Sequence, residues 1–270
     1  MIEEKEYEIT LVTKEPFRVG GVGNPLSGVD NPVAKVGDRI AVPGTTLKGA
    51  YRCAIERYLI DNFFDQTKKI WSNESFRPCI PSTKLTPDEN ELVKNKFYNF
   101  YNLKSDKWDT KGDGCHYPCT NKCNEARNHS KKHYICPACY FLGANGLDGF
   151  VRVPFLYAEE RINELYSANI DRYTQTVKQG TNRPYQLVPD GTIFKGVMTV
   201  LVKDTIRSRE IGKARRLADD THGDIWLENE PRAQEEIIKE FILDRVKSIN
   251  LIGGYKSKGF GKVEIDIEEL

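Results

Sequence analysis

The sequence has no long apolar segment and almost no net charge. No apolar run approaches the roughly 18 residues that a membrane-spanning helix needs, and no secretory signal opens the chain, so we expect a cytoplasmic protein without a membrane partner. Lys and Arg number 40 against 39 Asp and Glu, which leaves a net charge of +1. Overall charge therefore predicts no binding to nucleic acid, and any basic surface must come from local clustering.

Patterns for covalent catalysis and for disulfides are also missing. None of the four histidines belongs to a convincing Ser/His/Asp or Cys/His arrangement, and His222 stands alone in a charged stretch. The seven cysteines are not expected to form disulfides in a cytoplasmic protein. Cys53 is expected in the core, and Cys79 is expected in a loop.

The other five cysteines crowd into residues 115–139, which predicts a bound metal. Tetrahedral Zn²⁺ takes four thiolate or imidazole ligands, and two cysteine pairs joined by a short loop supply them. The preferred ligands are Cys119, Cys123, Cys136 and Cys139. Cys115 or His116 could replace one of the first two. Such a site has no open position and would be structural; the alternative is a set of reduced, unligated thiols.

Hydrophobic periodicity predicts an α+β fold in a single domain over 1–270. Strands are expected at 5–13, 150–158, 193–203 and 262–267. Helices are expected from 47 to 59, with Thr45 or Thr46 as N-cap, and over 237–249, after Pro231. The order β, α, β, β, α, β suits a ferredoxin-like or RRM-like sheet. Residues 17–45 are expected as a loop and 205–230 as an irregular connection. A zinc-bearing finger insertion is expected over 65–145, with little core of its own in residues 65–135. A projecting hairpin is expected over 160–192, centred on 171–188.

Two glycine- and lysine-containing segments suit a phosphate backbone. Residues 42–52 read VPGTTLKGAYR and place Lys48 and Arg52 on one face of a helix start, where free N–H groups favour anions. The alternative is that Arg52 pairs with Glu56 and Lys48 is solvated. Residues 253–262 read GGYKSKGFGK, a flexible loop with cations and aromatic rings that could stack on a base. The alternative is a tight turn after a helix.

Asp30 lies in residues 28–33, which read GVDNPV, within the long glycine-rich loop. A carboxylate there could bind a divalent cation or help to activate a 2′-hydroxyl. The alternative is a turn residue before proline.

These segments resemble the RAMP superfamily of CRISPR proteins. Residues 42–52 and 253–263 resemble two of its glycine-containing motifs. Residues 28–33, CPACYFLG at 136–143, and IDR at 170–172 with VPDGTIF at 188–194 are similar to motifs of the backbone subunit of type III (Csm- or Cmr-like) effector complexes. The resemblance implies a modified RRM-like palm, a zinc-bearing or helical finger insertion and a thumb hairpin.

The same resemblance implies roles for single residues. Asp30 would cut target RNA, with Mg²⁺ or another divalent cation. Lys48, Arg52, Lys256 and Lys258 would hold the guide RNA, and the hairpin would splay a base pair between guide and target. Two positions depart from the family pattern. Arg18 stands where many members carry histidine, and we include it among the RNA-binding residues; Lys258 stands where arginine is usual.

The sequence thus predicts a guide-RNA-binding backbone subunit that cleaves bound target RNA. Its partners would be guide RNA, target RNA, copies of itself and other type III subunits. The alternatives are an inactive RNA-binding scaffold, a standalone endoribonuclease that processes the guide precursor through a histidine or lysine base, and a zinc-stabilised RNA-binding protein outside CRISPR.

Overall fold

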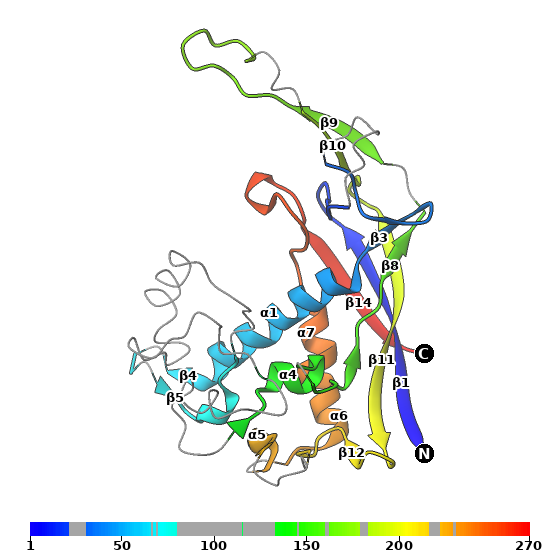
Figure 1. Cartoon of the computed structure of the whole chain (residues 1–270), viewed down its shortest axis with the longest axis vertical. Coiled ribbons are helices and arrows are strands. Elements are labelled where there is room, and N and C mark those ends of the chain that lie inside the picture. Colours follow the sequence, from blue (N-terminus) through cyan, green and yellow to red (C-terminus); the bar gives the residue numbers. More distant parts are fainter. Residues whose placement is uncertain are drawn as a thin grey trace. The chain divides into compact units, whose positions relative to one another are not determined.

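A computed structural model of the chain (Figure 1) describes residues 1–21, 31–65, 67–68, 70–79, 115, 133–144, 146–159, 162–178, 183–215, 222–228 and 231–270. The chain divides into two compact units. The first contains Met1–Lys5, Arg52–Arg152 and Thr199–Arg245, and the second contains Glu6–Tyr51, Val153–Met198 and Val246–Leu270. The expected insertion at 65–145 falls largely outside the described residues, so the single domain with one insertion stays a prediction.

The main sheet is antiparallel, and most of its residues belong to the second unit. Its strands in spatial order are β14 (Val263–Glu269), β1 (Ile2–Thr13), β11 (Ile193–Asp204), β8 (Leu156–Ala158), β3 (Arg39–Val42) and β2 (Lys35–Val36). In the first unit, β7 (Val151–Arg152) and β12 (Arg209–Glu210) pair with the later half of β11. The strands predicted at 5–13, 193–203 and 262–267 are confirmed, and the strand predicted at 150–158 is split into β7 and β8.

Alternating side chains explain the central strands. Ile9 and Leu11 of β1 are buried and lie opposite Ile267 and Ile265 of β14. Such a two-residue period places one face of each strand in the core. The prediction of an unbroken loop over 17–45 was wrong, because β2 and β3 form a short antiparallel pair within it. Ile40 and Val42 are buried there, but the run is too short to show a pattern in the sequence.

Helix α1 (Gly44–Phe63) begins three residues earlier than expected. The carbonyl of Pro43 accepts from the N–H groups of Thr46 and Leu47, so both predicted N-cap threonines lie inside the helix. A Cβ atom on Gly44 would lie 2.9 Å from the carbonyl oxygen of Val153, and this close approach requires glycine at the helix start. Residues at helical spacing form the buried face: Leu47, Tyr51, Ile55 and Leu59.

A hairpin occupies the region expected to project. Its strands are β9 (Asn163–Ser167) and β10 (Arg183–Leu187), paired antiparallel with Leu165 opposite Tyr185 (Figure 1). Strand β9 lies before the 171–188 segment in which the two runs were expected, whereas β10 lies inside it, and both strands lie within 160–192. All five residues of β9 are exposed, so the hairpin has little core of its own.

The first unit has an aromatic core that hydrophobic periodicity did not predict. Trp226 of α5 (Ile225–Glu228) is fully buried and contacts Phe76 of η1 (Glu74–Phe76), Tyr140 and Phe141 of α4 (Pro137–Leu142), and Phe241. The expectations of little core after residue 65 and of an irregular connection at 205–230 were therefore wrong for the described residues. Short strand pairs complete this unit: β4 (Phe64–Asp65) with β5 (Ile70–Trp71), and β6 (His133–Tyr134) with β13 (His222–Gly223).

Residues 205–230, expected as an irregular connection, contain a buried ion pair between Arg215 and Asp224. Arg215 Nε and Nη2 donate to the carboxylate of Asp224 at 2.8 and 2.9 Å, and the guanidinium lies 4.8 Å from the ring centroid of Tyr140. Both side chains are almost completely buried. Fork-shaped pairing of this kind fixes the geometry of two chain segments.

The helix predicted over 237–249 is confirmed and contains a π-helical segment. It consists of α6 (Gln234–Ile237), η2 (Ile238–Leu243) and α7 (Asp244–Lys247). The π-helical turn carries the buried side chains Ile238, Phe241 and Ile242. Across the described ranges, no helix is long and apolar enough to cross a membrane.

Candidate metal centre and candidate RNA-binding face

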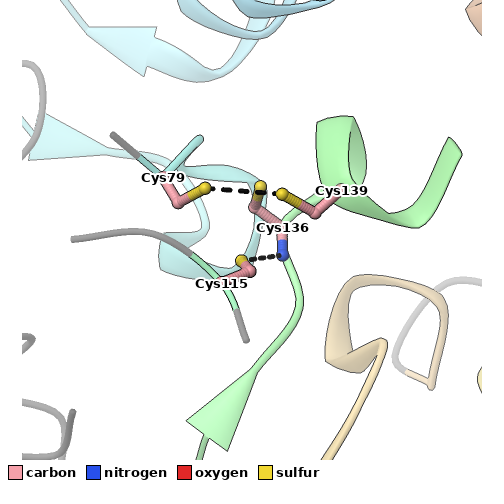
Figure 2. A group of neighbouring side chains, drawn as sticks. All are labelled: Cys79, Cys115, Cys136 and Cys139. Carbon is pink, nitrogen blue, oxygen red and sulfur yellow. Dashed lines mark hydrogen bonds between the residues drawn. The ribbon is translucent and has the colours of Figure 1, made fainter. Parts of the chain in front are cut away.

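Four buried cysteines of the first unit lie close together, and their sulfur atoms point toward one another (Figure 2). Cys79 follows η1, Cys115 lies at a distant point of the chain, Cys136 directly precedes α4, and Cys139 lies in its first turn. Their sulfur atoms are all within 4.8 Å of one another. We call this group the cysteine cluster.

The geometry of the cysteine cluster is compatible with zinc. Sulfurs at the corners of a tetrahedron with Zn–S distances of about 2.3 Å are separated by roughly 3.8 Å. Cys79 Sγ and Cys139 Sγ are 3.5 Å apart, which is far longer than a disulfide of about 2.05 Å. The backbone N–H of Cys136 donates to Cys115 Sγ at 3.4 Å. Burial acts to raise the pKa of Cys136 well above its usual value, so a metal ion would be needed to hold that thiolate.

An arginine and a glutamate border the cluster. Arg52 Nη1 donates to Cys139 Sγ at 3.4 Å, and Nη2 donates to Cys79 Sγ at 3.2 Å. Glu56 Oε1 lies 2.7 Å from Arg52 Nε. Burial acts to lower the pKa of Arg52, but negative charge on the cluster sulfurs, in their thiolate form, and on Glu56 raises it well above its usual value. Burial raises the pKa of Glu56 to about 7, although the positive charge of Arg52 acts to lower it.

The cluster differs from the preferred ligand set. Cys136 and Cys139 belong to it, and so does Cys115, the substitute named from sequence. Cys79 takes the remaining place, although it was expected to be a simple loop residue. Cys119, Cys123 and His116 lie outside the described residues. No short motif marks Cys79, because its nearest cluster partner follows 36 residues later. Cys53, expected in the core, is exposed.

The second unit contains the loop at residues 253–262, which we call the glycine loop. Its centre is the 3₁₀ turn η3 (Lys256–Lys258), preceded by Tyr255 with a φ of 58°. The guanidinium carbon of Arg18 and the Nζ of Lys258 lie 5.0 and 4.9 Å from the ring centroid of Tyr255. Lys256 and Lys258 are exposed, whereas Arg18 is buried and its Nε has no hydrogen-bond partner among the described residues.

Strand β10 contacts both the glycine loop and the chain at Asn31, two segments that are distant from it in sequence. Tyr185 of β10 packs against Tyr255 and Phe260, with ring centroids 5.8 and 6.3 Å apart. The N–H of Gln186 donates to the carbonyl oxygen of Asn31 at 3.0 Å. The glycine loop is fixed by a hydrogen bond of 2.9 Å from the Gly254 N–H to the carbonyl oxygen of Arg18.

The remaining predicted site residues are Lys48, Arg52 and Asp30. Lys48 is exposed at the start of the second turn of α1. Arg52 is engaged with Glu56 and the cysteines, so the alternative pairing that the sequence left open is the one observed. Asp30 lies outside the described residues, but its neighbour Asn31 is held by β10.

A protein-family model matches most of the chain. Comparison with the curated proteins found no match to this chain. The family model of the RAMP superfamily, a group of CRISPR-associated RNA-binding proteins that includes some ribonucleases, matches residues 10–264. The mixed α+β fold with a large antiparallel sheet fits that family. Because the match spans nearly the whole sequence, the chain belongs to the RAMP superfamily.

Proposed function

We propose that this chain is a guide-RNA-binding backbone subunit of a type III CRISPR effector complex and that it cleaves the bound target RNA. Family membership and the strand order support this assignment. The four main predicted strands lie in the order fourth, first, third, second, as in a ferredoxin-like or RRM-like palm built from two interleaved βαβ units. The hairpin β9–β10 would be the thumb.

The meeting of three segments at Tyr185 carries the proposal. The chain just after Asp30, the hairpin strand β10 and the glycine loop are joined there by ring contacts and a backbone hydrogen bond. Each of these segments was assigned to RNA from sequence for a different reason. Their proximity supports one surface that holds guide and target and carries a carboxylate.

Exposed cations would contact the guide backbone. Lys48 stands at the positive end of α1, where free N–H groups also favour phosphate. Lys256 and Lys258 are exposed on the glycine loop. Arg18 contacts the ring of Tyr255 and so supports that loop, and its positive charge would add to the attraction for the RNA backbone. Arg52 is omitted from this set, because its guanidinium is committed to the cysteine cluster.

Exposed apolar side chains of the hairpin would act on the bases. Tyr166 is 63% exposed and Tyr173 is 99% exposed. An aromatic ring in this position stacks on a base irrespective of its identity, and insertion between guide and target would splay one base pair. The adjacent 2′-hydroxyl of the target would then attack its own phosphate, with Asp30 accepting the hydroxyl proton. The P–O5′ bond would break as the 2′-oxygen bonds to phosphorus, and the leaving 5′-oxygen would take a proton from water. A divalent cation such as Mg²⁺ would neutralise charge at that phosphate.

Zinc would have a structural role in the first unit. The cysteine cluster supplies four thiolates and no open position, so we assign Zn²⁺ to Cys79, Cys115, Cys136 and Cys139. The ion would tie the segment after η1 to the start of α4, across a long stretch of chain.

Footprinting of the guide tests the proposed function. The chain is assembled with a CRISPR RNA and with the other subunits of its complex, and the RNA is then probed with a small chemical nuclease. We expect protected positions that repeat at a regular interval, one interval for each copy of the chain. A single protected patch, independent of the number of copies, would contradict a backbone subunit.

A further inference from the structure

Arg52 contacts the cysteine cluster from helix α1. Its two terminal nitrogens donate to sulfurs from two distant segments, Cys79 and Cys139, and Nη2 also donates to the carbonyl oxygen of Cys79 at 3.1 Å. Only 14% of the side chain is exposed. A guanidinium in this position cannot also form a fork with a phosphate of bound RNA.

We propose that Arg52 is a positioning residue of a metal centre, whose guanidinium stabilises the Cys79 and Cys139 thiolates when zinc is bound. The inference rests on the proposed zinc site. Four thiolates around Zn²⁺ carry a net charge of −2, and the sulfurs of all four cysteines are buried. A buried charge is unfavourable unless it is compensated by opposite charge and hydrogen bonds. Arg52 supplies both.

Glu56 holds Arg52 in this orientation. Glu56 lies one helical turn further along α1, and its carboxylate is 2.7 Å from Arg52 Nε. Only 17% of the Glu56 side chain is exposed. Nε forms this ion pair without the geometry of a hydrogen bond, whereas Nη1 and Nη2 donate to the sulfurs. Groups that orient the partners of metal ligands influence metal affinity although they do not touch the metal. An ordinary buried ion pair between Arg52 and Glu56 is the competing explanation, and it predicts no influence on zinc.

Variants of the full chain separate these explanations. R52Q removes the charge, and R52K keeps the charge but loses the fork. R57Q is the matched control, because Arg57 is an exposed arginine of the same helix. Zinc affinity is measured by competition with a chromogenic chelator. We expect R52Q to bind zinc about 10–100-fold more weakly than the wild type, R52K to show a smaller loss, and R57Q to match the wild type.

Two further readouts exclude a purely structural role. In Co²⁺-loaded protein, the thiolate-to-cobalt charge-transfer bands should shift in R52Q and not in R57Q. The difference in unfolding temperature between zinc-loaded and zinc-free protein should narrow in R52Q, because weaker binding stabilises less. If R52Q does not fold, R52K carries the same three measurements.

These measurements separate the proposed role of Arg52 from the proposed zinc site. A wild type that binds no zinc would overturn both. Equal zinc affinity, unshifted cobalt bands and an undiminished temperature difference in the Arg52 variants would overturn the role of Arg52 and leave the zinc site in place.

Discussion

The ring of Tyr185 meets the ring of Tyr255 edge to face, with centroids 5.8 Å apart and planes inclined by 76°. This contact joins the hairpin to the glycine loop, two elements separated by about 70 residues of sequence. Edge-to-face pairs of this kind contribute about 0.5–1.5 kcal/mol beyond the area they bury. The lysines of the loop and the strands of the hairpin are therefore held in a defined relation within the second unit.

Removal of the loop lysines should reduce the salt dependence of guide binding. If Lys256 and Lys258 contact phosphates, each alanine substitution lowers the slope of log affinity against log salt by roughly 0.7 for single-stranded RNA. Affinity should fall by a similar factor for guides of different sequence. Binding is measured over a series of salt concentrations, with Lys239→Ala, an exposed lysine of η2, as control. A slope that stays the same in the double variant would place these lysines away from RNA.

Within the glycine loop, alanine should be tolerated better at Gly259 than at Gly253. Gly253 and Gly259 both have positive φ, 95° and 78°, and alanine at such a position loses about 1 kcal/mol. Only at Gly253 would the added Cβ also clash, at 2.4 Å from the carbonyl oxygen of Arg18. We expect Gly253→Ala to lower both the free energy of unfolding and the affinity for guide RNA by more than Gly259→Ala. Equal effects in denaturant titrations and binding assays would argue against the close packing of this loop on Arg18.

Cysteine variants should identify the zinc ligands. Protein purified without added metal is expected to contain about one zinc per chain, and Cys79→Ser should reduce that content. Cys53→Ser is the control, because Cys53 is exposed and apart from the cluster. Cys119→Ser and Cys123→Ser should retain zinc. Retention of zinc in Cys79→Ser together with its loss in Cys119→Ser would restore the ligand set preferred from sequence.

Acid should release the metal. Burial raises the pKa of Cys136 in the metal-free chain, so its thiol is protonated before binding and must lose that proton to coordinate zinc. Zinc uptake therefore releases protons, and zinc affinity rises with pH. Zinc competition at several pH values, with proton release followed by an indicator in weak buffer, checks the sign. An affinity that does not change with pH would exclude thiol ligands.

Sequence periodicity predicted the long elements of the sheet and the two helices well. In β1, β11 and β14 the side chains alternate over many residues, so the pattern is unambiguous. Short strands such as β3 give no such pattern. Trp226 was missed because the apolar run around it, residues 225–227, is only three residues long, and its burial comes from aromatic partners on distant elements.

The candidate sites were predicted less completely, for a related reason. Pairs close in sequence, such as Cys136 and Cys139, could be recognised by their spacing. Cys79 joins them through folding over a long distance, which no local motif records. Arg52 has the spacing expected of a phosphate ligand on α1, but burial directs it toward sulfur. Local chemistry thus predicted a cation on this face of the helix, while the tertiary structure decided its partner.

The role of this chain as a target-RNA nuclease is tested by cleavage in the assembled complex. Wild type, Asp30→Ala and the control Asp38→Ala, an exposed aspartate of the turn between β2 and β3, are compared on the same guide and target. We expect cuts at regular intervals in the wild type and the control, abolished by EDTA. We expect no cuts in Asp30→Ala, with guide and target binding unchanged. Cuts that persist at the same intervals in Asp30→Ala would contradict the nuclease assignment and leave an RNA-binding scaffold.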